Sequence, residues 1–142
     1  MAYLPGNMPV FMRQPNAGSV AVTAAETTTL QTLYTAGPNG SKIFGIWCSS
    51  IDTANKDLVI NRVTVTPTTY IMWTVPIPIT SGTVDGIAMV NCMNPTYAAG
   101  LPVDNDGNPF FYLAIGDTLQ VNALATLTAG KSFNVTCIAA DF

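Results

Sequence analysis

The segment that decides the fold is SFNVTCIA, residues 132–139, in which apolar and small polar side chains alternate. Successive side chains of a β-strand point to opposite faces, so this alternation predicts a strand with one buried and one exposed face. The side chains predicted to face inward are Phe133, Val135, Cys137 and Ala139. The predicted outward face consists of Ser132, Asn134 and Thr136, which are small and uncharged.

The same alternation recurs in TLQVNALATL, residues 118–127, and in LVINRVTVT, residues 58–66. The first segment is predicted to turn inward Leu119, Val121, Ala123, Ala125 and Leu127. The second places on one face Val59, Val63 and Val65. The segment KIFGIWCSS, residues 42–50, is nearly all apolar, which indicates a central strand that is buried on both faces or faces a partner.

Turn-forming sequences such as GPNG at residues 37–40 and DGNP at residues 106–109 separate these strands. No long window has the 3.6-residue period of an amphipathic helix. About eight short strands with frequent turns predict an all-β fold, a two-sheet β-sandwich that is jelly-roll-like. Pro76 and Pro78 remove backbone donors, so their segment is expected at a sheet edge.

We divide the chain into an extended N-terminal arm, residues 1–18, and a β-sandwich domain, residues 19–142. The arm contains three prolines and has no regular period. We expect it to lie on its own domain or across a neighbouring subunit. The apolar side chains predicted to bind the partner there are Leu4, Met8, Val10, Phe11 and Met12.

Charged residues make up 9% of the chain, against ~25% in ordinary domains, and the net charge is −3. A surface with so little charge associates readily, because few ions must be desolvated. The five cations are scattered, so no nucleic-acid site is expected. No apolar run is long enough to predict a membrane span, and no signal peptide is expected.

The sequence contains no histidine, which removes Ser-His-Asp and Cys-His catalysis and the commonest metal ligand. Cys48, Cys92 and Cys137 each lie among apolar residues, and we interpret them as small buried side chains without a disulfide. We therefore expect no catalytic residues and no cofactor.

The segment DNDGN, residues 104–108, is similar to a calcium-binding loop. Its glycine stands at the fourth position, whereas an EF-hand loop has glycine at the sixth. Asp104 and Asp106 remain a calcium candidate, and a simple tight turn is the favoured alternative.

The aromatic residues Trp47, Trp73 and Tyr70 could form a platform on which a sugar stacks. Large aromatic side chains on strands more often pack against the opposite sheet, so we expect Trp73 in the core. A carbohydrate-binding module is nevertheless one of the functions to be weighed.

Two long stretches carry a resemblance to a known family. The first is GSKIFGIWCSS at residues 40–50 with DTANKDL at residues 52–58. The second begins with GLPVDNDGNP at residues 100–109 and continues through GDTL at 116–119 to the final ADF. Together they resemble small virion proteins of tailed bacteriophages, of the head-decoration (cement) type.

The resemblance implies a β-rich virion structural protein that is made in the host cytoplasm and lies on the capsid exterior. Its expected partners are the major capsid protein and further copies of itself in a homotrimer. Such a protein stabilises the shell by binding the outside of neighbouring capsid subunits. The alternatives are another phage head or tail component and a carbohydrate-binding β-sandwich module.

Overall fold

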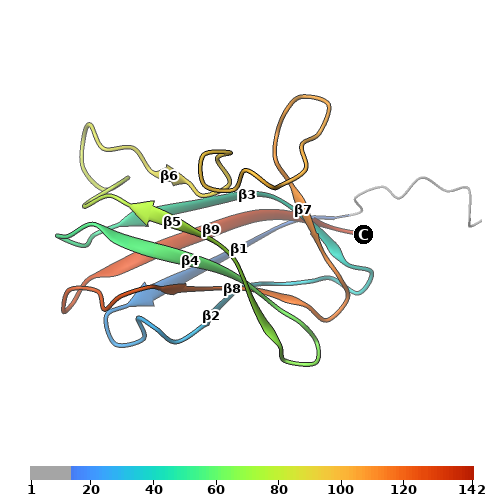
Figure 1. Cartoon of the computed structure of the whole chain (residues 1–142), viewed down its shortest axis with the longest axis horizontal. Coiled ribbons are helices and arrows are strands. Elements are labelled where there is room, and N and C mark those ends of the chain that lie inside the picture. Colours follow the sequence, from blue (N-terminus) through green and yellow to red (C-terminus); the bar gives the residue numbers. More distant parts are fainter. Residues whose placement is uncertain (1–13) are drawn as a thin grey trace, which may run out of the picture.

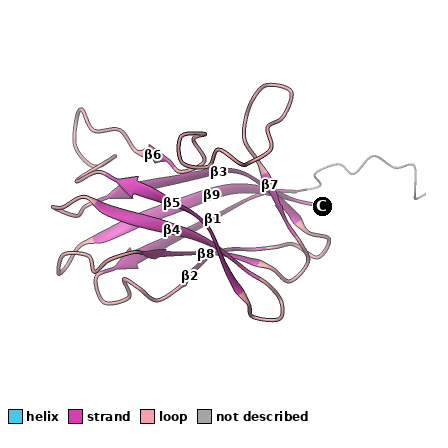
Figure 2. Cartoon of the chain, in the orientation of Figure 1, coloured by secondary structure: helices cyan, strands magenta, loops and turns pink. Residues whose placement is uncertain are grey.

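The computed structural model describes residues 14–142, which form two antiparallel β-sheets packed face to face (Figure 1). The predicted all-β sandwich is confirmed, since these residues contain strands, turns and loops but no helix (Figure 2). None of them therefore forms a helix that could cross a membrane.

One sheet, sheet A, contains β1 (Gln14–Thr23), β9 (Ser132–Asp141), β3 (Ser41–Ser50) and β6 (Val90–Asn91) in that order, and β7 (Phe111–Leu113) also pairs with β3. The other, sheet B, contains β2 (Gln31–Thr35), β8 (Thr118–Ala123), β4 (Lys56–Val63) and β5 (Thr69–Ile77). The first strand of each sheet pairs with the last, and the chain moves repeatedly from one sheet to the other. This order is that of a jelly roll.

The expected arm of residues 1–18 overlaps β1, because this strand begins at Gln14 and its Cα pairs with that of Asp141. Residues 14–18 thus belong to sheet A. The arm side chains predicted to bind a partner lie outside the described residues; they are Leu4, Met8, Val10, Phe11 and Met12.

The core lies between the sheets and confirms the alternation predicted for β9. All four of its predicted inward side chains are buried, and its largest, Phe133, has no exposed surface. In β8 the prediction was wrong at one position, because the strand ends at Ala123 and Ala125 is exposed in the loop that follows. The three cysteines are free and buried as predicted, and burial raises the pKa of the Cys137 thiol to about 11.

In strand β4 the apolar run of the sequence does not show which side chains point into the core. Val59 and Val63 share a face, as the alternation predicts, but Leu58 and Ile60 are the residues that point into the core. Val59 pairs with Asn122 and Thr74, which lie on the outer surface of sheet B.

Strand β3 is central in sheet A, but the prediction of burial on both faces holds only in part. Ile43, Ile46 and Cys48 face the core. A bulge between Ile43 and Gly45 turns Phe44 outward, where 39% of its side chain is exposed. Strand β5 forms one edge of sheet B and contains Pro76, which confirms the predicted edge position.

Two carboxylates tie loops to the sandwich. Asp52 is buried and accepts hydrogen bonds from Thr128 Oγ1 at 2.6 Å, from the Thr128 amide at 2.9 Å and from the Ala54 amide. Burial opposes its ionisation, but these hydrogen bonds outweigh it and hold the pKa of Asp52 below its usual value.

Asp141 is tied in the same manner at the opposite end of β9. It accepts hydrogen bonds from Tyr34 Oη at 2.6 Å and Ser41 Oγ at 2.5 Å. Burial opposes ionisation here too, but these donors hold the pKa of Asp141 below its usual value. Burial and the neighbouring Asp141 raise the pKa of Tyr34 to about 12.

Candidate binding surfaces

The outer surface of sheet B is largely uncharged, and its one ionisable strand residue is Asp57, near the start of β4. Residues that share this face by register are Thr32, Thr35, Thr118, Gln120, Asn122, Val59, Asn61, Ile71 and Thr74. We call these nine residues the neutral face. Val59 and Asn61 are already buried within the chain, and none of the nine is ionisable, so a partner could cover the exposed ones without desolvating an ion.

Side-chain amides on the neutral face are already hydrogen-bonded to one another. Asn61 donates through Nδ2 to Asn122 Oδ1 at 2.9 Å, and Gln120 donates to Thr118 Oγ1 at 2.9 Å. These bonds restrict the side chains before any partner arrives, which lowers the entropic cost of burying them. The surface is therefore both uncharged and largely ordered.

Ile71 is the exposed apolar side chain of the neutral face, whereas Val59 is buried. At 71% it has the largest exposed fraction among the large apolar side chains of residues 14–142. It sits where the register of β4 and β5 shifts, between Ile60 and Asn61, so that Asn61 pairs with Ile71. An exposed apolar side chain surrounded by neutral polar groups is a candidate anchor for a partner.

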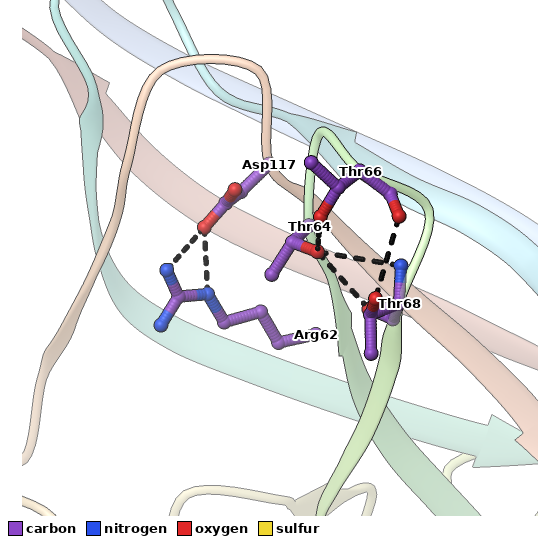
Figure 3. Close-up of polar contacts among 5 residues, drawn as sticks. All are labelled: Arg62, Thr64, Thr66, Thr68 and Asp117. Atoms are coloured by element: carbon purple, nitrogen blue, oxygen red, sulfur yellow. Dashed lines mark hydrogen bonds and ion pairs between the residues drawn. The ribbon is translucent and has the colours of Figure 1, made fainter.

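Arg62, the cation nearest the neutral face, is turned to the inner side and paired, whereas Asp57 lies at the end of this face next to Pro76. Arg62, on the inner side of β4, donates through Nε to Asp117 Oδ2 at 2.6 Å (Figure 3). The adjacent β4–β5 hairpin is closed by neutral groups, with the Thr64 amide donating to the Thr68 carbonyl at 3.0 Å. The hydroxyls of Thr64 and Thr66 lie 3.2 Å apart at its tip (Figure 3).

The outer side of sheet A differs, because a hollow lies between β3 and the loop that precedes β7, orange in Figure 1. Its volume is about 330 Å³. The aromatic side chains of its wall are Phe44 and Trp47, and the polar ones are Lys42, Asn91, Asp104 and Asn108. We call this hollow the Trp47 pocket.

The Trp47 ring lies over Gly45, two residues earlier on the same strand. A Cβ placed on Gly45 would stand 2.2 Å from Cη2 of Trp47, so any larger residue there would displace the ring. Strand pairing places Asn91 of β6 opposite Trp47. The aromatic wall of the pocket therefore depends on a glycine and on a two-residue strand from a distant part of the chain.

The loop of residues 104–108 is closed by its own hydrogen bonds. Asp104 Oδ1 accepts the amides of Asp106 at 3.0 Å and Asn108 at 2.9 Å, and the Asp104 amide donates to the Asn108 carbonyl. The Asn108 amide is the main cause that lowers the pKa of Asp104, and Lys42 contributes. Residues 14–142 hold no cluster of three or more acidic, histidine or cysteine side chains suited to a metal ion. Asp104 thus serves as a turn cap in this arrangement, while Asp106 is exposed.

The three aromatic residues proposed as a sugar platform do not lie together. Trp73 packs edge-on against Phe111 with ring centroids 5.8 Å apart, and its Nε1 donates to the Cys92 carbonyl at 2.9 Å, which confirms its predicted core position. Tyr70 is exposed on β5. Only Trp47 lines the pocket, together with Asp104 from the predicted calcium loop.

Comparison with known proteins does not identify a family for this chain. No protein family model matches the chain, and no curated protein matches it. Among solved structures, the chain is similar to the Drosophila NLP core, a structure described for its pentamer formation and histone binding. The two chains are 11% identical with a TM-score of 0.43, over 91% of this chain and 98% of that one.

Proposed function

We propose that this chain is a non-enzymatic structural protein that decorates and stabilises a bacteriophage capsid by binding the outside of the major capsid subunits. The observation that carries the proposal is the neutral face, an uncharged surface that spans the four strands of sheet B and exposes Ile71. The resemblance of residues 40–142 to head-decoration proteins suggests which partner covers this face.

Burying an uncharged surface costs little desolvation free energy. Burying an ion without a partner is expensive, whereas hydroxyl and amide groups keep their hydrogen bonds or exchange them with the partner. Ile71, on the edge strand β5, would add an apolar contact to this mainly polar surface. A modest affinity per copy is sufficient on a shell, since linked binding sites raise the effective concentration of each copy.

The placement of three of the eight acidic side chains supports a non-enzymatic role. Asp52, Asp117 and Asp141 hold loops or pair with Arg62, as described above. Acid–base catalysis requires a titratable group aimed at a substrate, whereas these groups are engaged within the fold.

Self-association belongs to the same proposal. We propose a homotrimer whose arms, residues 1–13, reach adjacent capsid subunits from the end of the sandwich where Gln14 pairs with Asp141. Another head or tail component of the virion is the alternative, because the neutral face suits any partner that repeats on a particle.

Imaging of purified particles by electron cryomicroscopy tests the proposal. We expect density for the sandwich on the capsid exterior, with sheet B toward the capsid. Density in the tail would favour the alternative component, and absence of the protein from the particle would contradict both.

Deletion of residues 1–13 tests the role of the arm, because it leaves β1 intact from Gln14. We expect fewer copies per capsid. Capsid occupancy equal to that of the full chain would contradict the arm contact while leaving the neutral face untouched. The mass of the purified protein in solution tests the trimer separately, and a monomer would contradict it.

A further inference from the structure

We propose that the Trp47 pocket on sheet A binds a neutral carbohydrate. The two tryptophans provide the first observation. Trp73 packs against the core and its Nε1 donates to the Cys92 carbonyl, whereas Trp47 lines the pocket on the outer side of sheet A. The Trp47 indole thus faces a cavity, and one side of its ring is supported by Gly45.

Hydrogen-bond donors and an acceptor line the pocket together with the Trp47 ring. Lys42 Nζ lies 4.4 Å from the centre of the Phe110 ring, which holds the ammonium group beside the pocket. Asn91 uses Oδ1 to accept the Met93 amide at 3.1 Å, which leaves its Nδ2 group as a donor. Asp104 Oδ1 takes both loop amides, so further acceptor capacity remains on its second oxygen.

An indole beside an ammonium group, an amide and a carboxylate favours a neutral ligand with many hydroxyl groups. A purely apolar ligand would displace water from Lys42 and Asp104 without offering hydrogen bonds in exchange, which opposes its binding. An anion would face Asp104, and a cation would face Lys42. A neutral sugar ring avoids these conflicts, because its hydroxyl groups both donate and accept while its C–H face packs on the indole.

The size of the cavity fits the same class. Its volume of about 330 Å³ is at the lower end of small-ligand pockets, which span roughly 300–1,000 Å³. We therefore assign one sugar ring to the pocket, with the remaining rings of a longer glycan outside it. The pocket lies on the sheet opposite the neutral face, so both surfaces can be occupied together.

A glycan array followed by nuclear magnetic resonance tests this inference. The array identifies a neutral glycan, which is then titrated into ¹⁵N-labelled protein while the two indole N–H signals are followed. We expect the Trp47 signal to shift saturably and the Trp73 signal to stay in place. A silent array, binding of charged glycans only, or a ligand that leaves the Trp47 signal unmoved would overturn the proposal.

The variant Trp47→Ala should weaken the binding about tenfold or more, which corresponds to about 1.4 kcal/mol. An unshifted Trp73 signal in this variant shows that the core is intact. Tyr70→Ala is the matched control, because it removes an exposed aromatic ring on the other sheet. Equal binding by Trp47→Ala and the original chain would overturn the proposal. This test does not depend on the capsid role, which has its own readout.

Discussion

The two outer surfaces of this sandwich are built from similar strands but differ in shape and in charge. Sheet B presents a neutral face whose amides bond to each other and whose one prominent apolar side chain is Ile71. Sheet A carries a hollow with an indole, an ammonium group and a carboxylate. The difference indicates that one surface suits a broad protein partner and the other a small polar ligand.

Both surfaces depend on the shared core, so the largest effect is expected from Phe133→Ala. This side chain is fully buried between the sheets, and its removal should cost about 3–5 kcal/mol of unfolding free energy. Denaturant unfolding measures the loss. Ile71→Ala, at an exposed position, should change stability by no more than about 0.5 kcal/mol, and similar losses in the two variants would contradict the assignment of core and surface.

Acid should weaken the ends of the sandwich through Asp52 and Asp141. The folded-state pKa of each carboxyl is lowered, so its contribution is complete above the unfolded value of about 4 and is lost as pH falls through the folded pKa. Melting temperatures between pH 7 and pH 2 should fall only at the acidic end. Asp52→Asn should flatten this dependence, whereas Asp106→Asn, in an exposed loop, should leave it unchanged.

Substitutions on the neutral face should weaken capsid binding, whereas substitutions on the outer side of sheet A should not. Ile71→Asp replaces the most exposed apolar side chain of the neutral face with a charge, and we expect the capsid affinity to fall by about 2 kcal/mol, or about 30-fold. Ile138→Asp is the matched control on the outer side of sheet A. Equal loss in both variants, measured as copies per capsid, would show that the two surfaces are not distinct.

Calcium should have the smallest effect. Because Asp104 Oδ1 caps its own loop, addition of calcium or of a chelator should leave the melting temperature unchanged. A rise of several degrees with calcium that the chelator reverses would restore the loop of residues 104–108 as a metal site.

The sequence predicted the sandwich because the strands that cover the core alternate clearly, as in β9. It left the faces of β4 ambiguous, since Leu58, Val59 and Ile60 are all apolar and only pairing with β5 and β8 decides which of them points inward. Ala125 was misplaced because the alternation continues past Ala123, where the strand ends.

The Trp47 pocket could not be predicted from local pattern. Asn91 pairs with Trp47 in the two-residue strand β6. Asp104 lies in a loop more than fifty residues after β3 in the sequence. The bulge that turns Phe44 outward also leaves no mark in the apolar run. The one local signal was Gly45, which stands two residues before Trp47 and so shares its face.

Hydroxyl-radical footprinting of the free protein and of intact particles shows which outer surface is covered on the particle. We predict that Ile71 is strongly labelled in the free protein and protected on the particle, while Trp47 is labelled to the same extent in both. Equal labelling of Ile71 in both states, or protection of Trp47 in place of Ile71, would contradict the assignment of the neutral face as the docking surface.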